Sequence, residues 1–220
     1  MYLTRMYLNI RRRSAMVLLN SPQRMHAAVE SAFPPESSDP SSGRALWRID
    51  RQSTATSLIL ASPTEPDLTH LVEQAGWQTG EMWQTRPYAP LLDALTKGQT
   101  WRFRLTANPT YSGCKDGWSD TKPRGHVTVK QQEGWLISRC SRLGIAIPDG
   151  PSGEAELAVF DRRLLRFHRG SSAPVTIATA TYEGVLDVVD PALLRNALIV
   201  GIGRAKAYGC GLLTLAPQGT

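Results

Sequence analysis

The 220-residue sequence predicts an α+β protein in which one order of elements, β-α-β-β-α-β, occurs twice in succession. Residues 100–107 alternate apolar and polar side chains with the period of a strand. A capping residue followed by proline, which is typical of a helix start, occurs at 20–22 in the first half and at 190–191 in the second. The length suffices for two small domains with a core each.

The first half begins with a strand-like run and ends with another. We expect a strand at 2–10, a helix from 20–22 to 33, a polar loop at 36–43, a hairpin of 45–51 and 54–61, a short helix at 67–75 and a strand at 80–88. Pro34 and Pro35 stop the first helix, and Asp67 is a candidate cap for the second.

The second half repeats this order after a connection at 90–98. We expect a strand at 100–107, a loop at 108–124, a helix at 131–143, a long hairpin of 157–168 and 175–188 across 169–172, a helix at 192–200 and a strand at 212–216. Two such units in succession are two tandem ferredoxin-like, or RRM-like, domains, which we place at 1–90 and 98–220.

Charge and composition restrict the partners. The net charge is +6 and the pI is near 9.5, which favours a polyanion, either nucleic acid or acidic lipid. No apolar run has membrane-spanning length and the first residues lack a signal-peptide core, so we expect a cytoplasmic protein without membrane contact. Three distant cysteines, without a Cys-x-x-Cys pair, indicate reduced thiols and no metal site, and no cofactor motif is present.

A glycine-rich segment near the C-terminus is the most informative motif. Glycines at this density let the backbone approach a phosphate, and two cations supply charge. The spacing fits neither a dinucleotide-binding nor a Walker motif. A plain helix–strand connector is the alternative to an RNA-binding segment. The candidate RNA-binding residues are Gly201, Gly203, Arg204, Lys206, Gly209 and Gly211.

Three motifs in this layout resemble the CasE family, the CRISPR RNA-processing endoribonucleases of type I-E systems. They are residues 105–110, 183–186 and 201–212. The resemblance implies cleavage of precursor CRISPR RNA at the base of the repeat hairpin. In this family the neighbouring 2′-hydroxyl attacks the phosphate without a metal, leaving a 2′,3′-cyclic phosphate. It also implies that the product stays bound among the other Cascade subunits, and we expect a monomer before assembly.

His26 lies early in the first predicted helix, where this family keeps its catalytic histidine. Histidine suits proton transfer because its unperturbed pKa lies near neutral pH. Whether it acts as base or acid stays open, and a half-buried packing histidine is the alternative. Some family members have a tyrosine three residues earlier, where this chain has Gln23. Gln23 either donates a hydrogen bond to a phosphate or is a surface helix residue.

The long hairpin is basic and, by the same resemblance, lies against the RNA stem. A solvated edge strand with protective cations is the alternative. The candidate RNA-binding arginines are Arg162, Arg163 and Arg166 on the hairpin and Arg24 beside the histidine.

Two other functions compete with a metal-independent endoribonuclease. The first is a non-catalytic subunit that only binds the hairpin; Gln23 in place of tyrosine favours this interpretation, and the presence of His26 argues against it. A small-molecule enzyme on the same fold is disfavoured by the basic pI and by the lack of a carboxylate cluster or cofactor motif.

Overall fold

The computed structural model describes residues 1–34, 43–77, 79–80, 82–113, 122–151, 153–168 and 174–218. The polar loop expected at 36–43 lies outside the described residues except for its last residue. The hairpin turn expected at 169–172 and the middle of the loop at 108–124 also lie outside them.

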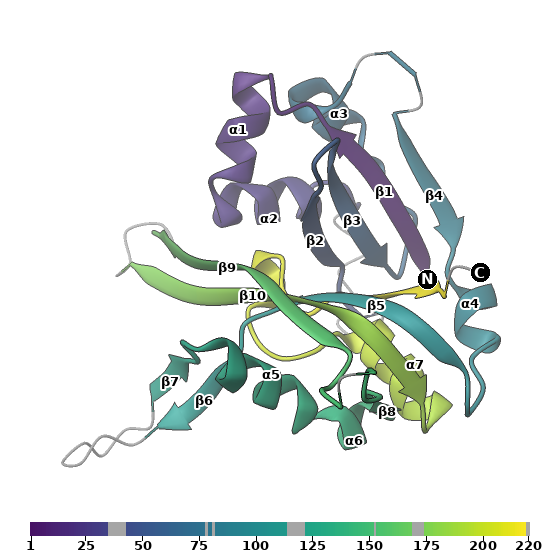
Figure 1. Ribbon diagram of the computed structural model, residues 1–220. Coiled ribbons are helices and arrows are strands. Elements are labelled where there is room, and N and C mark those ends of the chain that lie inside the picture. Colours follow the sequence, from purple (N-terminus) through teal and green to yellow (C-terminus); the bar gives the residue numbers. More distant parts are fainter. Residues whose placement is uncertain are drawn as a thin grey trace.

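Four antiparallel strands form the N-terminal sheet, in the order β2-β3-β1-β4. The strands are β1 (Tyr2–Leu8), β2 (Leu46–Arg51), β3 (Thr56–Ser62) and β4 (Trp83–Pro87). Three helices lie along this sheet: α1 (Arg13–Leu19), α2 (Pro22–Glu30) and α3 (Thr69–Ala75) (Figure 1). The core between helices and sheet includes the buried side chains of Met6, Met25, Val29, Leu58 and Leu71.

The C-terminal sheet repeats the same pairing. Its order is β11-β5-β10-β8, and β9 also pairs with β10. The strands are β5 (Thr100–Ala107), β8 (Ile145–Ala146), β9 (Leu157–Phe167), β10 (Val175–Val188) and β11 (Leu213–Pro217). The helices α5 (Val129–Ile137), α6 (Cys140–Leu143) and α7 (Pro191–Val200) lie on one side of it (Figure 1).

The two sheets share part of one hydrophobic core. Leu46, Ala61 and Tyr88 of the N-terminal half belong to the same cluster of buried side chains as Leu105 and Leu212 of the C-terminal half. The β9–β10 hairpin extends beneath α2, so the two halves meet at the N-terminal helices as well (Figure 1). The predicted class, two tandem ferredoxin-like units, is confirmed by the order of elements and the sheet pairing in the two halves. The division at 90 and 98 stays a prediction.

Several element predictions are confirmed closely. Strand β10 has the predicted bounds, and α7 begins as expected. The Asp190 carboxylate accepts hydrogen bonds from Ala192 N at 2.9 Å and Leu193 N at 3.1 Å, and Pro191 occupies the first turn. Ser21 caps α2 in the same manner by accepting a hydrogen bond from Arg24 N at 3.3 Å.

Other expectations are wrong or incomplete. Helix α1, which was not expected, follows β1 after residues 9–12, and Ala15 and Leu18 give it a buried apolar face. The segment expected as a loop at 108–124 contains a strand pair, β6 (Thr110–Gly113) and β7 (Lys122–Gly125). The helix expected at 131–143 is broken at Ser138 and Arg139 into α5 and α6. The connection at 90–98 contains part of a short helix, α4 (Ala89–Asp93).

Candidate active site

His26 lies in the second turn of α2, on a helix whose other face is anchored in the core by Met25 and Val29. Its side chain is 29% exposed, and its Nδ1 atom lies 3.7 Å from Oε1 of Glu30, one turn further along. Nδ1 is buried and has no hydrogen-bond partner in the described structure. Because Nδ1 is buried, Nε2 is the ring nitrogen that we expect to contact a substrate.

Tyr208 meets this histidine from the C-terminal half. It ends a short 3₁₀ turn, η3 (Lys206–Tyr208). The rings of His26 and Tyr208 lie edge to face, with centroids 6.1 Å apart and planes at 69°. Phe167, at the end of β9, contacts the Tyr208 ring with centroids 4.7 Å apart. The Tyr208 hydroxyl donates a hydrogen bond to Oε1 of Gln23 at 3.4 Å. Tyr208 thus contacts both Gln23 and His26, and the role of these two residues in a reaction stays a prediction.

Sequence reasoning did not select Tyr208 as a site residue. The available signal was its position inside the glycine-rich segment, next to Gly209. Nothing in the spacing, however, indicates that residue 208 packs on a helix more than 180 positions earlier.

The backbone conformation of this segment explains why glycine stands at four of its positions. Gly201, Gly203, Gly209 and Gly211 all have φ between 78° and 90°, a region that L side chains rarely adopt. A Cβ on Gly209 would lie 2.7 Å from Cζ3 of Trp47 in β2, so the close approach of this backbone to the N-terminal sheet requires glycine.

Backbone hydrogen bonds close the segment into a loop. Ile202 N donates to Gly211 O at 2.9 Å, and Gly211 N donates to Thr106 O in β5 at 2.7 Å. Gly209 and Gly211 are buried and shape the loop, whereas Gly203 and Arg204 are exposed. Contact of this segment with RNA stays a prediction, which the exposed residues suit best.

Lys206 has a structural contact of its own. Its Nζ donates a hydrogen bond to Val200 O at the end of α7, at 2.8 Å. Burial lowers the pKa of Lys206, and the nearby charge of Arg44 lowers it further. A cation on the last carbonyls of a helix is a favourable cap, so Lys206 stabilises the start of the glycine-rich segment.

The basic hairpin has an irregularity beside its two adjacent arginines, Arg162 and Arg163. Two residues of β9 oppose one of β10 between the pairs Arg163–Thr179 and Phe160–Thr181, which makes a β-bulge. Asp161 lies in this bulge with φ of 44°. The bulge changes which face the following side chains point to.

Arg162 and Arg163 lie on opposite faces of β9, as adjacent residues of a strand do. Arg162 Nε donates to Oε1 of Gln132 in α5 at 2.9 Å, and its guanidinium also bonds Val127 O. Arg163 instead pairs with Asp161 at 2.5 Å and lines a cavity of about 80 Å³ with Tyr208. Arg163 is therefore on the side of the candidate active site, whereas Arg162 holds the hairpin to α5.

The cavity beside Arg163 is positively charged. Burial lowers the pKa of Arg51, which lines the same cavity, and the charge of Arg163 lowers it further, while Asp161 opposes this shift. Two neighbouring guanidinium groups with one carboxylate leave a net positive charge, which suits an anionic ligand. Arg166 is exposed and directly precedes the buried Phe167, so the two side chains point to opposite faces of β9.

Arg24 lies on a different face of α2 from Gln23 and His26. It lines a shallow basin of about 940 Å³ with Arg13 of α1 and His70 of α3. His70 is held by a 2.8 Å hydrogen bond between its Nε2 and Ala28 O. Arg24 is thus beside the histidine in sequence but does not share its contacts.

An ion-pair network joins the two sheets. Arg48 of β2 is 2% exposed and contacts both Asp50 oxygens, at 2.5 and 2.9 Å. The same guanidinium donates to Arg104 O at 2.9 Å, Leu212 O at 3.0 Å and Thr214 Oγ1 at 2.9 Å.

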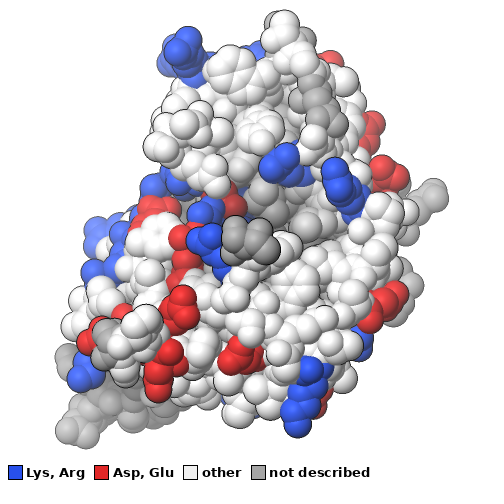
Figure 2. Space-filling view, turned by 45° about the vertical axis from the view of Figure 1, so that its right-hand side comes forward, with Lys and Arg blue, Asp and Glu red and all other residues white. Residues whose placement is uncertain are grey.

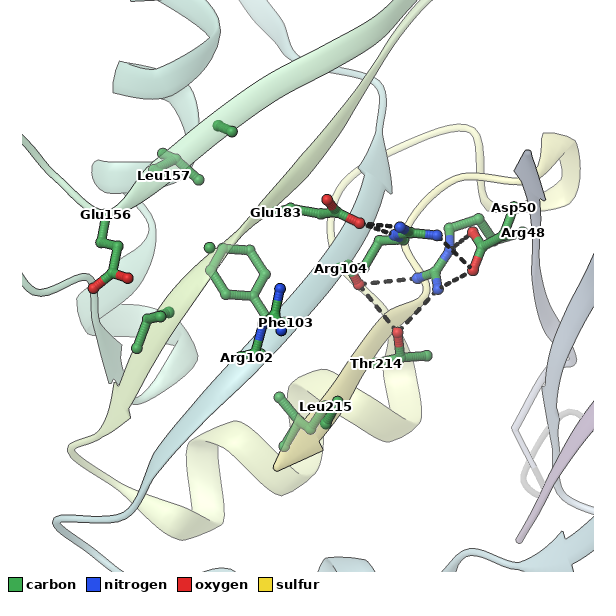
Figure 3. A pocket seen from close by; sticks show the side chains of 14 residues that line it. Arg48, Asp50, Arg102, Phe103, Arg104, Glu156, Leu157, Glu183, Thr214 and Leu215 are labelled. Carbon is green, nitrogen blue, oxygen red and sulfur yellow. Dashed lines mark hydrogen bonds and ion pairs between the residues drawn. The ribbon is translucent and has the colours of Figure 1, made fainter. Parts of the chain in front are cut away.

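Arg104 extends this network across β5. Its guanidinium lies between Asp50, at 3.2 Å, and Glu183 of β10 (Figure 3). These residues line a cavity of about 590 Å³, and Figure 2 shows basic and acidic side chains close together around a hollow between the upper and lower parts of the molecule. The charges pair with each other, so the network positions the two sheets and leaves no strong charge of one sign.

The described residues contain no group of three or more His, Cys, Asp or Glu side chains placed to hold a metal ion. Cys140 and Cys210 are buried and free, and Cys114 lies outside the described residues. Within the same part of the chain, no helix is long and apolar enough to cross a membrane.

Two antiparallel sheets, each with the strand order of a ferredoxin-like unit, place the chain in the class of tandem ferredoxin-like proteins. The chain belongs to the CRISPR associated protein family, whose family model matches residues 1–217.

Named relatives agree with this membership. The CRISPR-associated endoribonuclease Cse3 of Thermus thermophilus is 31% identical over 223 residues, covering 99% of this chain and all of the relative. The Cascade subunit CasE of Escherichia coli K12 is 42% identical over 123 residues, 52% of this chain and 57% of that protein.

Solved structures give the same result. A structure of the endoribonuclease Cse3 bound to a 19-nucleotide RNA has a TM-score of 0.82 at 29% identity, covering 99% of this chain and all of that one. Thermus thermophilus Cse3 bound to an RNA that represents a pre-cleavage complex has a TM-score of 0.80 at 30% identity, covering 98% of each chain.

Proposed function

We propose that the chain is an endoribonuclease that cleaves precursor CRISPR RNA at the base of the repeat hairpin and keeps the product bound. The attacking group is the 2′-hydroxyl next to the scissile phosphate. The reaction needs no metal ion and leaves a 2′,3′-cyclic phosphate and a 5′-hydroxyl. The observation that carries this proposal is the full-length similarity to an endoribonuclease whose structures contain RNA.

The local geometry suits this chemistry. The nucleophile is part of the substrate, so the protein must align it, move protons and stabilise the charge that develops on the phosphate. His26 supplies the proton transfer through Nε2, because Nδ1 is buried near Glu30.

The RNA stem is held by positive charge around this site. Arg163 and Arg51 give one side of the cavity its charge, and the exposed Arg204 extends it along the glycine-rich segment. Arg166 and Arg24 add charge further from the histidine. A-form RNA offers mainly phosphates and shape to such side chains, so these contacts bind the hairpin and the histidine cuts it.

The test is incubation of the pure protein with the host's own repeat RNA in EDTA, with the product ends identified. Cleavage with a cyclic phosphate on the upstream fragment is expected. A 2′-deoxy substitution 5′ of the scissile phosphate should abolish cleavage, because it removes the attacking oxygen. A strict Mg²⁺ requirement, or cleavage of the deoxy substrate, contradicts the mechanism.

The alternative is a non-catalytic subunit that binds the same hairpin, for which the specific observation is Gln23 beside His26. Tight binding of the cognate hairpin without cleavage would favour it. In either case we propose that the protein works in the cytoplasm, is a monomer before assembly and joins the other Cascade subunits. We also propose domains at 1–90 and 98–220.

A further inference from the structure

The contact between Tyr208 and Gln23 has a chemical consequence for the candidate active site. Gln23 lies one helical turn before His26, so the two side chains share a face of α2. The Gln23 carboxamide has one oxygen, which accepts, and one NH₂ group, which donates. The Tyr208 hydroxyl donates to that oxygen at 3.4 Å, so it determines which end of the amide faces the tyrosine.

Tyr208 is itself held from two sides. Phe167 packs on its ring, and the following residue, Gly209, lies against Trp47 of the N-terminal sheet. On the N-terminal side of the 3₁₀ turn, Ala205 has φ of 60°, so the backbone there has the left-handed conformation. A side chain fixed in this way can fix the group that it contacts.

Because the Gln23 oxygen accepts the hydrogen bond from Tyr208, the NH₂ group of the same amide is the group that can donate to a ligand beside His26. A neutral donor there suits a phosphate oxygen whose negative charge grows during the reaction. The hydrogen bond of 3.4 Å is long, and such contacts shorten when substrate fills a site.

We propose that Tyr208 is a positioning residue that orients the Gln23 carboxamide, so that the amide NH₂ donates to an oxygen of the scissile phosphate. This inference rests on the proposed cleavage of a phosphodiester at His26. It gives Gln23 a defined role in the site and adds a residue from the glycine-rich segment to the machinery on α2.

Three variants separate this role from a merely structural one. Tyr208→Phe keeps the ring that contacts His26 and Phe167 and removes only the hydroxyl. Gln23→Met removes both polar ends of the amide. Gln23→Glu keeps an oxygen that accepts from Tyr208 but has no NH₂ group to donate. Tyr7→Phe, at an exposed tyrosine of β1, is the matched control.

The first measurement is the single-turnover cleavage rate at saturating enzyme. We expect a loss of about 10²-fold for Gln23→Met, at the low end for removal of one donor to a developing oxyanion. Tyr208→Phe should lose about tenfold, the effect of roughly one net hydrogen bond. The double variant Tyr208→Phe/Gln23→Met should be no slower than Gln23→Met, because the hydroxyl acts through the amide. Gln23→Glu should lose at least as much as Gln23→Met.

The second measurement does not depend on cleavage. It compares affinity for the uncleavable 2′-deoxy repeat hairpin with affinity for the same hairpin ending before the scissile phosphate. Tyr208→Phe and Gln23→Glu should reduce the preference for the RNA that contains this phosphate, and Tyr7→Phe should not. Melting temperatures confirm that the variants are folded.

Four results would overturn the proposal: a wild-type rate for Tyr208→Phe, a wild-type rate for Gln23→Glu, additive losses in the double variant, or an unchanged preference for the scissile phosphate. A wild-type protein that binds the hairpin without cutting it contradicts the proposed nuclease function instead. The binding measurement then still decides the role of Tyr208.

Discussion

Replacing Arg48 with methionine removes the cation that joins the two sheets and keeps a side chain of similar length in the same space. Arg48 is buried and bonds Asp50, two backbone carbonyls and the Thr214 hydroxyl. Removal of one partner of a buried ion pair costs about 3–5 kcal/mol. Asp50 keeps Arg104 as a partner at 3.2 Å, so we expect the lower end, about 3 kcal/mol.

Urea unfolding gives the free energy directly, and a thermal scan should show a melting temperature lowered by roughly 6–12 °C for a chain of this size. Arg86→Met, at an exposed position of β4, is the control and should change stability by less than about 0.5 kcal/mol. Adding Asp50→Leu to Arg48→Met should recover part of the loss, since it removes the carboxylate left with one partner. A loss below about 1 kcal/mol for Arg48→Met would refute the reasoning, because the network would then contribute no more than exposed ion pairs do.

Three further predictions concern single groups. His26→Ala should lower the single-turnover rate by about 10²–10⁴-fold with little change in hairpin affinity, and loss of folding and binding together would instead identify a packing histidine. In salt-dependent anisotropy titrations, Arg163→Ala should flatten the slope of log affinity against log salt by about 0.7, whereas Arg162→Ala, whose side chain is bonded to α5, should mainly lower the melting temperature. Equal effects of the two arginine variants on the slope would contradict their placement on opposite faces. Burial raises the pKa of the Cys210 thiol from 9.0 to about 12, so the folded state holds this proton more tightly and stability should fall as pH rises from 9.0 toward 12. Urea unfolding at about pH 8 and about pH 10 should show a smaller decrease for Cys210→Ala than for the wild type.

The sequence predicted the fold well where the signals are local. The cap at Asp190, the proline after it and the alternation along β5 depend on neighbouring residues, and the structure has these elements as expected. The strand pair β6–β7 was missed because its glycine, proline and polar residues indicate a loop. The pairing depends on contacts between the two strands, which composition does not reveal.

The candidate site was predicted only in part, and for a related reason. His26 was selected through the family resemblance, whereas its surroundings, which the sequence did not predict, come from β9 and the glycine-rich segment. Arg162 and Arg163 were both assigned to the RNA stem, through the family resemblance. As neighbours in a strand they point to opposite faces, but the sequence does not reveal that one face packs on α5 and the other faces Tyr208.

A continuous set of contacts links the buried ion network to the histidine. Arg48 bonds the carbonyl of Leu212, which directly follows the glycine-rich segment, and that segment carries Tyr208 against Gln23 and His26. The segment can adopt this path because glycine permits the positive φ angles that turn it back on β2 and β5. Arg48→Met should therefore slow cleavage at saturating RNA as well as destabilise the fold, since a loosened segment no longer holds the tyrosine at the amide. The two effects can be told apart at a temperature where the variant is fully folded: a remaining loss of rate comes from positioning, and a wild-type rate there would mean that the network stabilises the sheets without reaching the active site.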